Sequence, residues 1–261
     1  MRERFFKLRD KLLNTTPKIC IERAKIVTEA YKKYDAYPNI EKRAMALADV
    51  LRNMTIYIEE EQLLAGNQAS SNRAAPLFPE YAFAYILDEL DDLEKRSSDK
   101  FTITEEDKKV LREILPWWEG KTLKDRAIAM QPQEVLDDRV TGVLGWQGNV
   151  STGEGHIVPD YDMVVRLGFA GLRDKIQKHM DELDLSKPQD LEKLTFYRAC
   201  KAIIDGCLDY IKRYCTLAKE QAEQCEDAVR KEELSGIVRK STGNLFRGTA
   251  MCMVCTGHPA Y

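Results

Sequence analysis

The sequence lacks the features that mark several large classes of protein. It has no apolar run long enough to cross a bilayer, and its charged, amphipathic start, MRERFFKLRDKLL, contains no signal-peptide core. Its formal net charge is only −3, so no bulk attraction to nucleic acid or to an anionic membrane is expected. Seven cysteines, an odd number spread through helical patterns, argue for a reducing compartment rather than a disulfide framework. These absences predict a cytoplasmic protein that binds neither nucleic acid nor membrane.

The sequence also lacks a nucleophile–base–orienter set, a phosphate-cradling loop and a complete set of metal ligands. The nearest approach to a metal site is the C-x-x-C…H pattern of Cys252, Cys255 and His258. A structural zinc site needs four ligands, and this tail offers three. A redox C-x-x-C usually opens a helix after a strand, and neither element is signalled here. The pattern therefore favours a tail without a metal or redox site.

Helical periodicity dominates what is present. Apolar residues recur at i, i+3 and i+4 along residues 20–34, 38–54 and 82–96. In the second of these segments, Asn39 is a plausible N-cap. Residues 191–234 predict one long helix or two abutting ones. The two tryptophans at 117 and 118, and the cysteines at 200, 207 and 215, are expected to pack rather than bind.

A further helix is predicted between Thr104, as its N-cap, and Pro116, as its terminator. A short alternating stretch, Thr55 to Ile58, predicts a strand. Glycine- and proline-marked loops follow at residues 59–81 and 145–161. The chain is thus predicted to be mainly α, with a short strand or two.

His156 is the candidate site residue. Gly153, Gly155 and Pro159 flank it, so its loop can bring backbone and imidazole close to a small ligand. A neutral histidine is a good hydrogen-bond partner or proton relay near neutral pH. The alternative is a histidine whose ring bonds a backbone carbonyl in a tight turn, and the pattern alone favours this alternative.

Five phrases follow one another along the chain: CIERAKIVTEAYKKY, LLAGNQASSNRAAPLFPEY, DELDDLEKR, ITEEDKKVLREILPWWEGKT and GHIVPDYDMVVRLGFAGL. Together they resemble the N-terminal portion of glycyl radical enzymes, the pyruvate formate-lyase-like superfamily. The resemblance is strongest to the branch of glycerol dehydratase and C–X lyases, and it runs collinearly from about residue 2 to residue 236. It covers only the first part of such an enzyme.

The resemblance implies a fragment of a ten-stranded α/β barrel, to which this stretch would give mainly the wrapping helices and an early strand. In the family, a SAM-dependent iron–sulfur activase installs a glycyl radical, which passes to a cysteine that abstracts hydrogen from the substrate. Neither the cysteine loop nor the glycyl loop is found in this sequence, so no cofactor is expected in the chain itself. By resemblance, His156 matches a histidine that hydrogen-bonds a substrate hydroxyl. The family's other partners are the activase, a small-molecule substrate and often a second copy of the chain.

The amino-acid composition of the chain changes near residue 237. No acidic residue follows Glu233, and the match to the family stops at about residue 236. Residues 1–236 are therefore predicted to be the N-terminal part of a pyruvate formate-lyase-like domain, and residues 237–261 a divergent tail. Read one nucleotide later, the codons of Met251-Cys252-Met253 force Cys and Trp, which fits the helix that follows in the family. We expect a frameshift between Ile237 and Lys240.

The resemblance, together with the change near residue 237, predicts a truncated enzyme that is a lyase or is formate acetyltransferase-like. By resemblance, such an enzyme uses radical chemistry under anaerobic conditions. Its full-length form would cleave C–O, C–N or C–C bonds in a small substrate, and this chain alone would be inactive. The alternative is a subunit of a split enzyme, completed in trans, or a stand-alone helical module that binds a partner.

Overall fold

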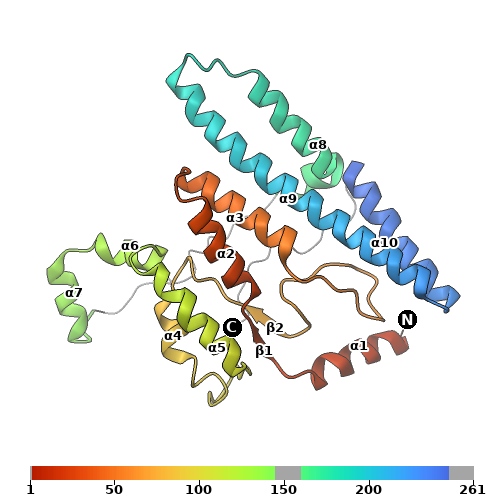
Figure 1. Cartoon of the computed structure of the whole chain (residues 1–261), viewed down its shortest axis with the longest axis horizontal. Helices are drawn as coiled ribbons and strands as arrows, with labels where there is room; N and C mark the ends of the chain where they lie inside the picture. The colour runs from red at the N-terminus through yellow and green to blue at the C-terminus, as the bar shows by residue number, and fades with distance from the viewer. Residues whose placement is uncertain (1, 145–159, 247–261) are drawn as a thin grey trace.

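The computed structural model describes residues 2–144 and 160–246 of the chain (Figure 1). The described part is mainly helical with two short strands, as predicted. Its helices are α1 (Arg2–Asn14), α2 (Glu22–Lys33), α3 (Asn39–Asn53), α4 (Ala84–Glu89), α5 (Glu105–Ile114), the 3₁₀ turn η1 (Leu115–Trp118), α6 (Leu123–Ala129), α7 (Gln133–Val140), α8 (Tyr161–Asp181), α9 (Pro188–Gln224) and α10 (Ala228–Phe246). The strands are β1 (Lys18–Cys20) and β2 (Ala74–Pro76). No helix in the described ranges is both long and apolar enough to cross a membrane.

The longest helix, α9, organises one half of the molecule. It contacts α3 along one side and α8 and α10 along the other, while α2 packs on α3 (Figure 1). The approach of α9 to α3 is close because Gly206 faces Ala48. A Cβ at residue 206 would lie 2.8 Å from the Ala48 Cα. The absence of a side chain at residue 206 therefore allows the short distance between α3 and α9, the two helices that line a cavity described below.

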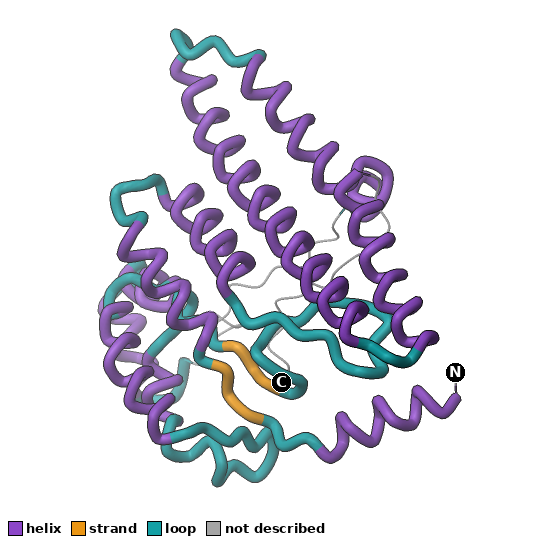
Figure 2. Tube along the Cα trace, turned by 45° about the vertical axis from the view of Figure 1, so that its right-hand side comes forward, coloured by secondary structure: helices purple, strands orange, loops and turns teal. Residues whose placement is uncertain are grey.

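The two strands lie in segments for which no strand was predicted. β1 and β2 pair in parallel, with Lys18 opposite Ala74 and Cys20 opposite Pro76, and Figure 2 shows them side by side between the helices. The resemblance leads us to expect ten strands in the complete fold, and the described residues form this two-stranded sheet.

The predicted strand at Thr55–Ile58 is wrong, because side chains and not a second strand bind its backbone. The Glu22 carboxylate accepts from the Thr55 N–H at 3.0 Å. The Thr55 carbonyl accepts from the Asn67 amide at 2.8 Å. The Ile58 carbonyl accepts from the Gln221 amide at 3.3 Å. An alternating pattern shows which residues are buried, as Ile58 is, but it does not supply a neighbouring strand.

The predicted start and end of α5 are confirmed, whereas the predicted N-cap of α3 is wrong. The Thr104 hydroxyl accepts from the Asp107 N–H at 3.1 Å, which confirms the predicted N-cap of α5. The α-helix ends at Ile114, ahead of Pro116, which lies in the 3₁₀ turn that begins at Leu115. Asn39 is not the N-cap of α3: Pro38 takes that position, without a side-chain cap, and Asn39 is the first helical residue.

The C-terminal helical region is two helices, which settles the alternative left open by the periodicity. The helix is interrupted between Gln224 and Ala228. There the Asp227 carboxylate accepts hydrogen bonds from the N–H groups of Val229 at 2.8 Å and Arg230 at 3.2 Å, which caps the second helix. The second helix, α10, continues to Phe246. The change of composition near residue 237 is therefore not the end of a helix.

Part of the hydrophobic core lies at the C-terminal end of α5 and in η1. Trp118 is fully buried, and its indole N–H donates to the Thr28 hydroxyl at 2.9 Å. Thr28 in turn donates to the Ala24 carbonyl at 2.6 Å, and Leu111 and Leu115 are also fully buried. This confirms the expectation that Trp118 packs, and it joins α2 to η1 through a buried hydrogen bond.

Candidate functional site

The residues that the sequence singled out lie outside the described part of the chain. His156 and the glycines around it fall within residues 145–159, and Cys252, Cys255 and His258 fall within residues 247–261. The structure does describe the residues that follow the first segment. There the Asp160 carboxylate accepts from the Met163 N–H at 2.9 Å and caps α8. The chain that leaves the His156 loop therefore enters a helix with a fixed start.

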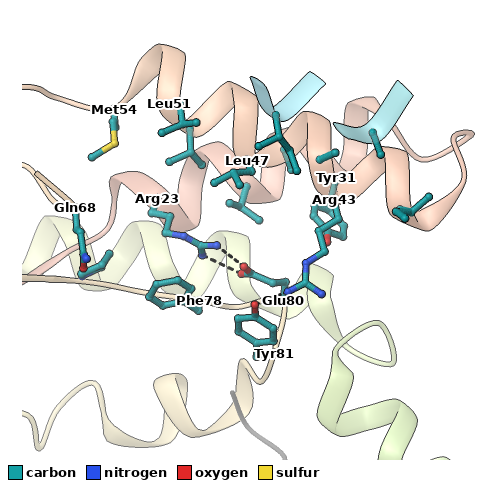
Figure 3. A pocket seen from close by; sticks show the side chains of 18 of the residues that line it. Arg23, Tyr31, Arg43, Leu47, Leu51, Met54, Gln68, Phe78, Glu80 and Tyr81 are labelled. Carbon is teal, nitrogen blue, oxygen red and sulfur yellow. Dashed lines mark hydrogen bonds and ion pairs between the residues drawn. The ribbon is translucent and has the colours of Figure 1, made fainter. Parts of the chain in front are cut away.

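The described residues surround a cavity of about 390 Å³ between α2, α3, α9 and the loop that follows β2 (Figure 3). This is the size range of small-molecule sites in proteins. Most of its wall is apolar and comes from α3 and α9. The wall residues that matter below are Tyr31, Leu47, Met54, Phe78, Phe196 and Cys200.

An ion pair forms the floor of this cavity. The Arg23 guanidinium meets the Glu80 carboxylate through both of its terminal nitrogens, one at 3.0 Å, and also donates to the Leu77 carbonyl at 3.1 Å. Its carbon lies 3.8 Å from the centroid of the Phe78 ring, in a cation–π contact. Only 16% of the Arg23 side chain and 9% of the Glu80 side chain are exposed, so this pair fixes the loop against α2.

A second arginine stands at the edge of the cavity, near the pair in Figure 3. Arg43 projects from α3 and donates to the Tyr81 hydroxyl at 2.5 Å, and its guanidinium carbon lies 5.3 Å from the Tyr81 ring centroid. Among the described residues no carboxylate forms an ion pair with Arg43. Burial, followed by the nearby Glu80 carboxylate, raises the pKa of Tyr31 to about 12, so its hydroxyl stays protonated across the physiological range.

Two further polar groups of the wall, Asn67 and Cys200, serve the fold or are inert. The Asn67 side chain donates to the carbonyls of Thr55 and Ala69, and its oxygen accepts from the Tyr214 hydroxyl. Burial raises the pKa of the Cys200 thiol, which keeps it protonated and weakly nucleophilic. The cavity therefore has the means to bind a ligand, and its described wall holds no activated nucleophile.

Within residues 2–144 and 160–246, no group of three histidine, cysteine or acidic side chains is arranged to hold a metal ion.

Reasoning from sequence missed this cavity. Its charged residues Arg23, Arg43 and Glu80 come from two helices and a loop, and none of them belongs to a spaced motif. The one available signal was local: Phe78, Glu80 and Tyr81 stand together in a proline-marked loop, PLFPEY.

Comparison with known proteins identifies the family to which most of the chain is similar. The family model described as pyruvate formate lyase-like matches residues 1–244. The probable dehydratase YbiW of Escherichia coli (strain K12) is 36% identical over 218 residues, which are 84% of this chain and 27% of YbiW. The (2S)-3-sulfopropanediol dehydratase of Klebsiella oxytoca is 33% identical, over 87% of this chain and 28% of that enzyme.

Solved structures agree. The glycerol-bound form of the B12-independent glycerol dehydratase from Clostridium butyricum superposes with a TM-score of 0.89 at 31% identity, over 95% of this chain and 31% of that one. A glycyl radical enzyme from Archaeoglobus fulgidus superposes with a TM-score of 0.81 at 31% identity, over 88% of this chain and 30% of that one. The chain thus spans less than a third of the length of each of these proteins.

Proposed function

Because the chain belongs to the pyruvate formate lyase-like family of glycyl radical enzymes, we propose that it is the N-terminal part of a radical dehydratase or lyase that acts on a small substrate. The observation that carries this proposal is the superposition on glycerol dehydratase, which covers 95% of this chain and 31% of that enzyme. In the complete form, C–O, C–N or C–C cleavage would depend on radical-bearing loops outside this sequence. The chain by itself is therefore inactive.

Exposed apolar side chains support a chain that is part of a larger fold. The helices α6 and α7 contain no buried residue. Met130, Val140 and Val143, in or beside them, are 86%, 89% and 82% exposed. Large apolar groups that stand in water usually mark a contact surface. The same observation supports the second candidate, a subunit of a split enzyme that is completed by another polypeptide; a stand-alone helical binding module is the third.

In the complete protein, His156 hydrogen-bonds a substrate hydroxyl and so holds the substrate for hydrogen abstraction. An activating enzyme of the SAM-dependent iron–sulfur type installs the glycyl radical, and two copies of the protein associate. His156 is the one residue of this sequence to which the resemblance gives a role in the site.

A chimera tests the proposal. Residues 1–236 replace the matching N-terminal part of the Clostridium butyricum glycerol dehydratase, and the purified protein is incubated anaerobically with the activating enzyme and SAM. We expect a glycyl radical signal in electron paramagnetic resonance, together with glycerol dehydration. This chain alone and the remaining part of the dehydratase alone should show neither. A chimera that is insoluble or free of radical, beside an active intact dehydratase, would refute the proposal.

The role of His156 is tested in the same chimera. The His156→Ala variant should keep the radical signal and lose most of its turnover, because the radical does not need the histidine but the substrate does. His156→Gln, which keeps a hydrogen-bonding side chain, should recover part of the turnover. Equal turnover in all three proteins would remove His156 from the site.

The tail from residue 237 is tested at the level of the gene. If residues 237–261 are read out of frame, the nucleotide sequence of the locus continues the family in a shifted frame from that point. A locus with no such continuation contradicts the frameshift, and leaves the split enzyme to be tested by the presence of a separate downstream polypeptide.

A further inference from the structure

The two ends of the cavity between α2, α3 and α9 differ in polarity and charge, and this difference indicates which class of ligand could bind. At one end the apolar wall comes from Leu51 of α3 and from Met54, which follows that helix, and Gln68 lies beside them (Figure 3). The other end holds Arg43 and Tyr81, and Figure 3 shows these two together, away from Met54 and Gln68. A ligand that fills the cavity therefore needs an apolar body and one polar end.

The charge at the polar end is positive. Arg23 and Glu80 neutralise each other, because the carboxylate is held by both terminal nitrogens of the guanidinium. Arg43 is left as the net charge of the wall, since no described carboxylate lies within ion-pair distance of it. A guanidinium at the edge of an apolar cavity favours a carboxylate, which it can bind through two parallel hydrogen bonds.

Two phenols add donors beside this charge. The Tyr81 oxygen accepts from Arg43 at 2.5 Å, so its own O–H remains available to donate. Tyr31 lines the same cavity, and its protonated hydroxyl is a donor as well. The polar end therefore offers three donors, from Arg43, Tyr81 and Tyr31. The carboxylate of the described wall, Glu80, is already paired with Arg23. Such a site binds a monoanion better than the neutral analogue of that ligand.

From this geometry we infer that the cavity binds a small monocarboxylate with an apolar body, held at its carboxylate by Arg43, Tyr81 and Tyr31. The residues that would hold the ligand all lie in the described part of the chain, and the inference does not depend on the radical function. The same chemistry could be supplied by an acidic side chain of a polypeptide that completes the fold, and the experiment below separates the two sources.

The probe pair is hexanoate and 1-hexanol, which differ in the charged group. Calorimetric titration of the full chain with hexanoate should show saturable one-site binding, and 1-hexanol should bind at least about tenfold more weakly. Arg43→Gln should weaken hexanoate binding by about 10- to 100-fold, since it removes charge-assisted hydrogen bonds, and should leave 1-hexanol unchanged. Arg166→Gln is the matched control: this exposed arginine pairs with Asp162 on α8 and is not among the residues that line the cavity, so its loss should change neither affinity.

Filling the cavity gives an independent test. Leu47→Trp should abolish the binding of both probes, with circular dichroism used to verify that the helices persist; if this variant fails to fold, the Arg43→Gln comparison still decides. No saturable binding of hexanoate, or equal affinity for the two probes, would overturn the inference. Binding by the isolated chain that disappears in the active chimera would assign the site to an acidic side chain of the rest of the fold, and would also overturn it. Failure of the chimera to form a radical bears on the proposed function alone, because the titration uses only this chain.

Discussion

The contact between α3 and α9 makes a prediction in which two effects of opposite sign compete. Replacing Gly206 by alanine places a Cβ 2.8 Å from the Ala48 Cα and 2.9 Å from the Ala48 Cβ. Real Cβ atoms do not approach so closely, and neither neighbour is the end of a flexible side chain, so one helix must move. Overpacking of this kind costs about 1–3 kcal/mol. Helix propensity acts the other way and favours alanine over glycine by about 0.8–1 kcal/mol.

We expect the packing cost to win, so that Gly206→Ala lowers the free energy of unfolding by about 1 kcal/mol. Gly236 in α10 offers a matched control. A Cβ there would meet nothing nearer than the end of the Arg239 side chain, at 3.8 Å. Only the propensity remains, and Gly236→Ala should raise the free energy of unfolding by up to about 1 kcal/mol.

The assay is urea unfolding of the full chain, followed by far-UV circular dichroism, with the midpoint and the slope compared among the three proteins. Opposite shifts of the midpoint at equal slope are the expected result. If Gly206→Ala shifts the midpoint upward as Gly236→Ala does, the close approach of α9 to Ala48 is not rigid, and the reasoning fails.

Three further predictions concern the core and the cavity floor. Thr28→Val leaves the buried indole N–H of Trp118 without an acceptor and should cost about 1–3 kcal/mol in urea unfolding, whereas Thr28→Ser keeps the oxygen and should cost less. Glu80→Gln leaves Arg23 without its carboxylate, and the loss should lie between the ~1 kcal/mol of an exposed pair and the ~3–5 kcal/mol of a buried one. Replacing both residues by apolar ones should cost less than Glu80→Gln, and a larger loss would contradict this account. Burial raises the pKa of Tyr31 to about 12 from 10.0, so the unfolded chain releases this proton first and stability should fall as the pH rises from 10 to 12. Tyr31→Phe should reduce that fall, and an unchanged pH profile would show that Tyr31 does not cause it.

How far the sequence predicts this fold depends on how local each signal is. The cap of α5 at Thr104 and its end before Pro116 were predictable because the atoms involved lie within one turn of each other. The strand predicted at Thr55–Ile58 failed because strand formation needs a partner from elsewhere in the chain. β1 found such a partner in β2, whose residues Ala74–Pro76 show no strand pattern of their own.

The same reasoning explains what could be known of the candidate sites. His156 could be proposed only because the phrase around it resembles a family, since a histidine among glycines has no distinctive spacing. The cavity was not predicted, because the one local signal, the proline-marked loop with Phe78, Glu80 and Tyr81, does not show which helices it meets. Arg23 and Glu80 are separated by 57 residues, and their pairing depends on how the loop after β2 returns to α2. Charged residues of this kind look like ordinary surface residues until the chain is folded.

The distribution of apolar side chains shows how this part of the molecule relates to a larger one. Leu111, Leu115 and Trp118 have no exposed surface, so the chain closes one core by itself. By contrast, α7 spans only Gln133–Val140 and buries none of its residues. An isolated helix of that length is not stable in water, because too few hydrogen bonds offset the cost of nucleation. A complete glycyl radical fold, of which this chain spans less than a third, would supply a further surface against which α7 could pack.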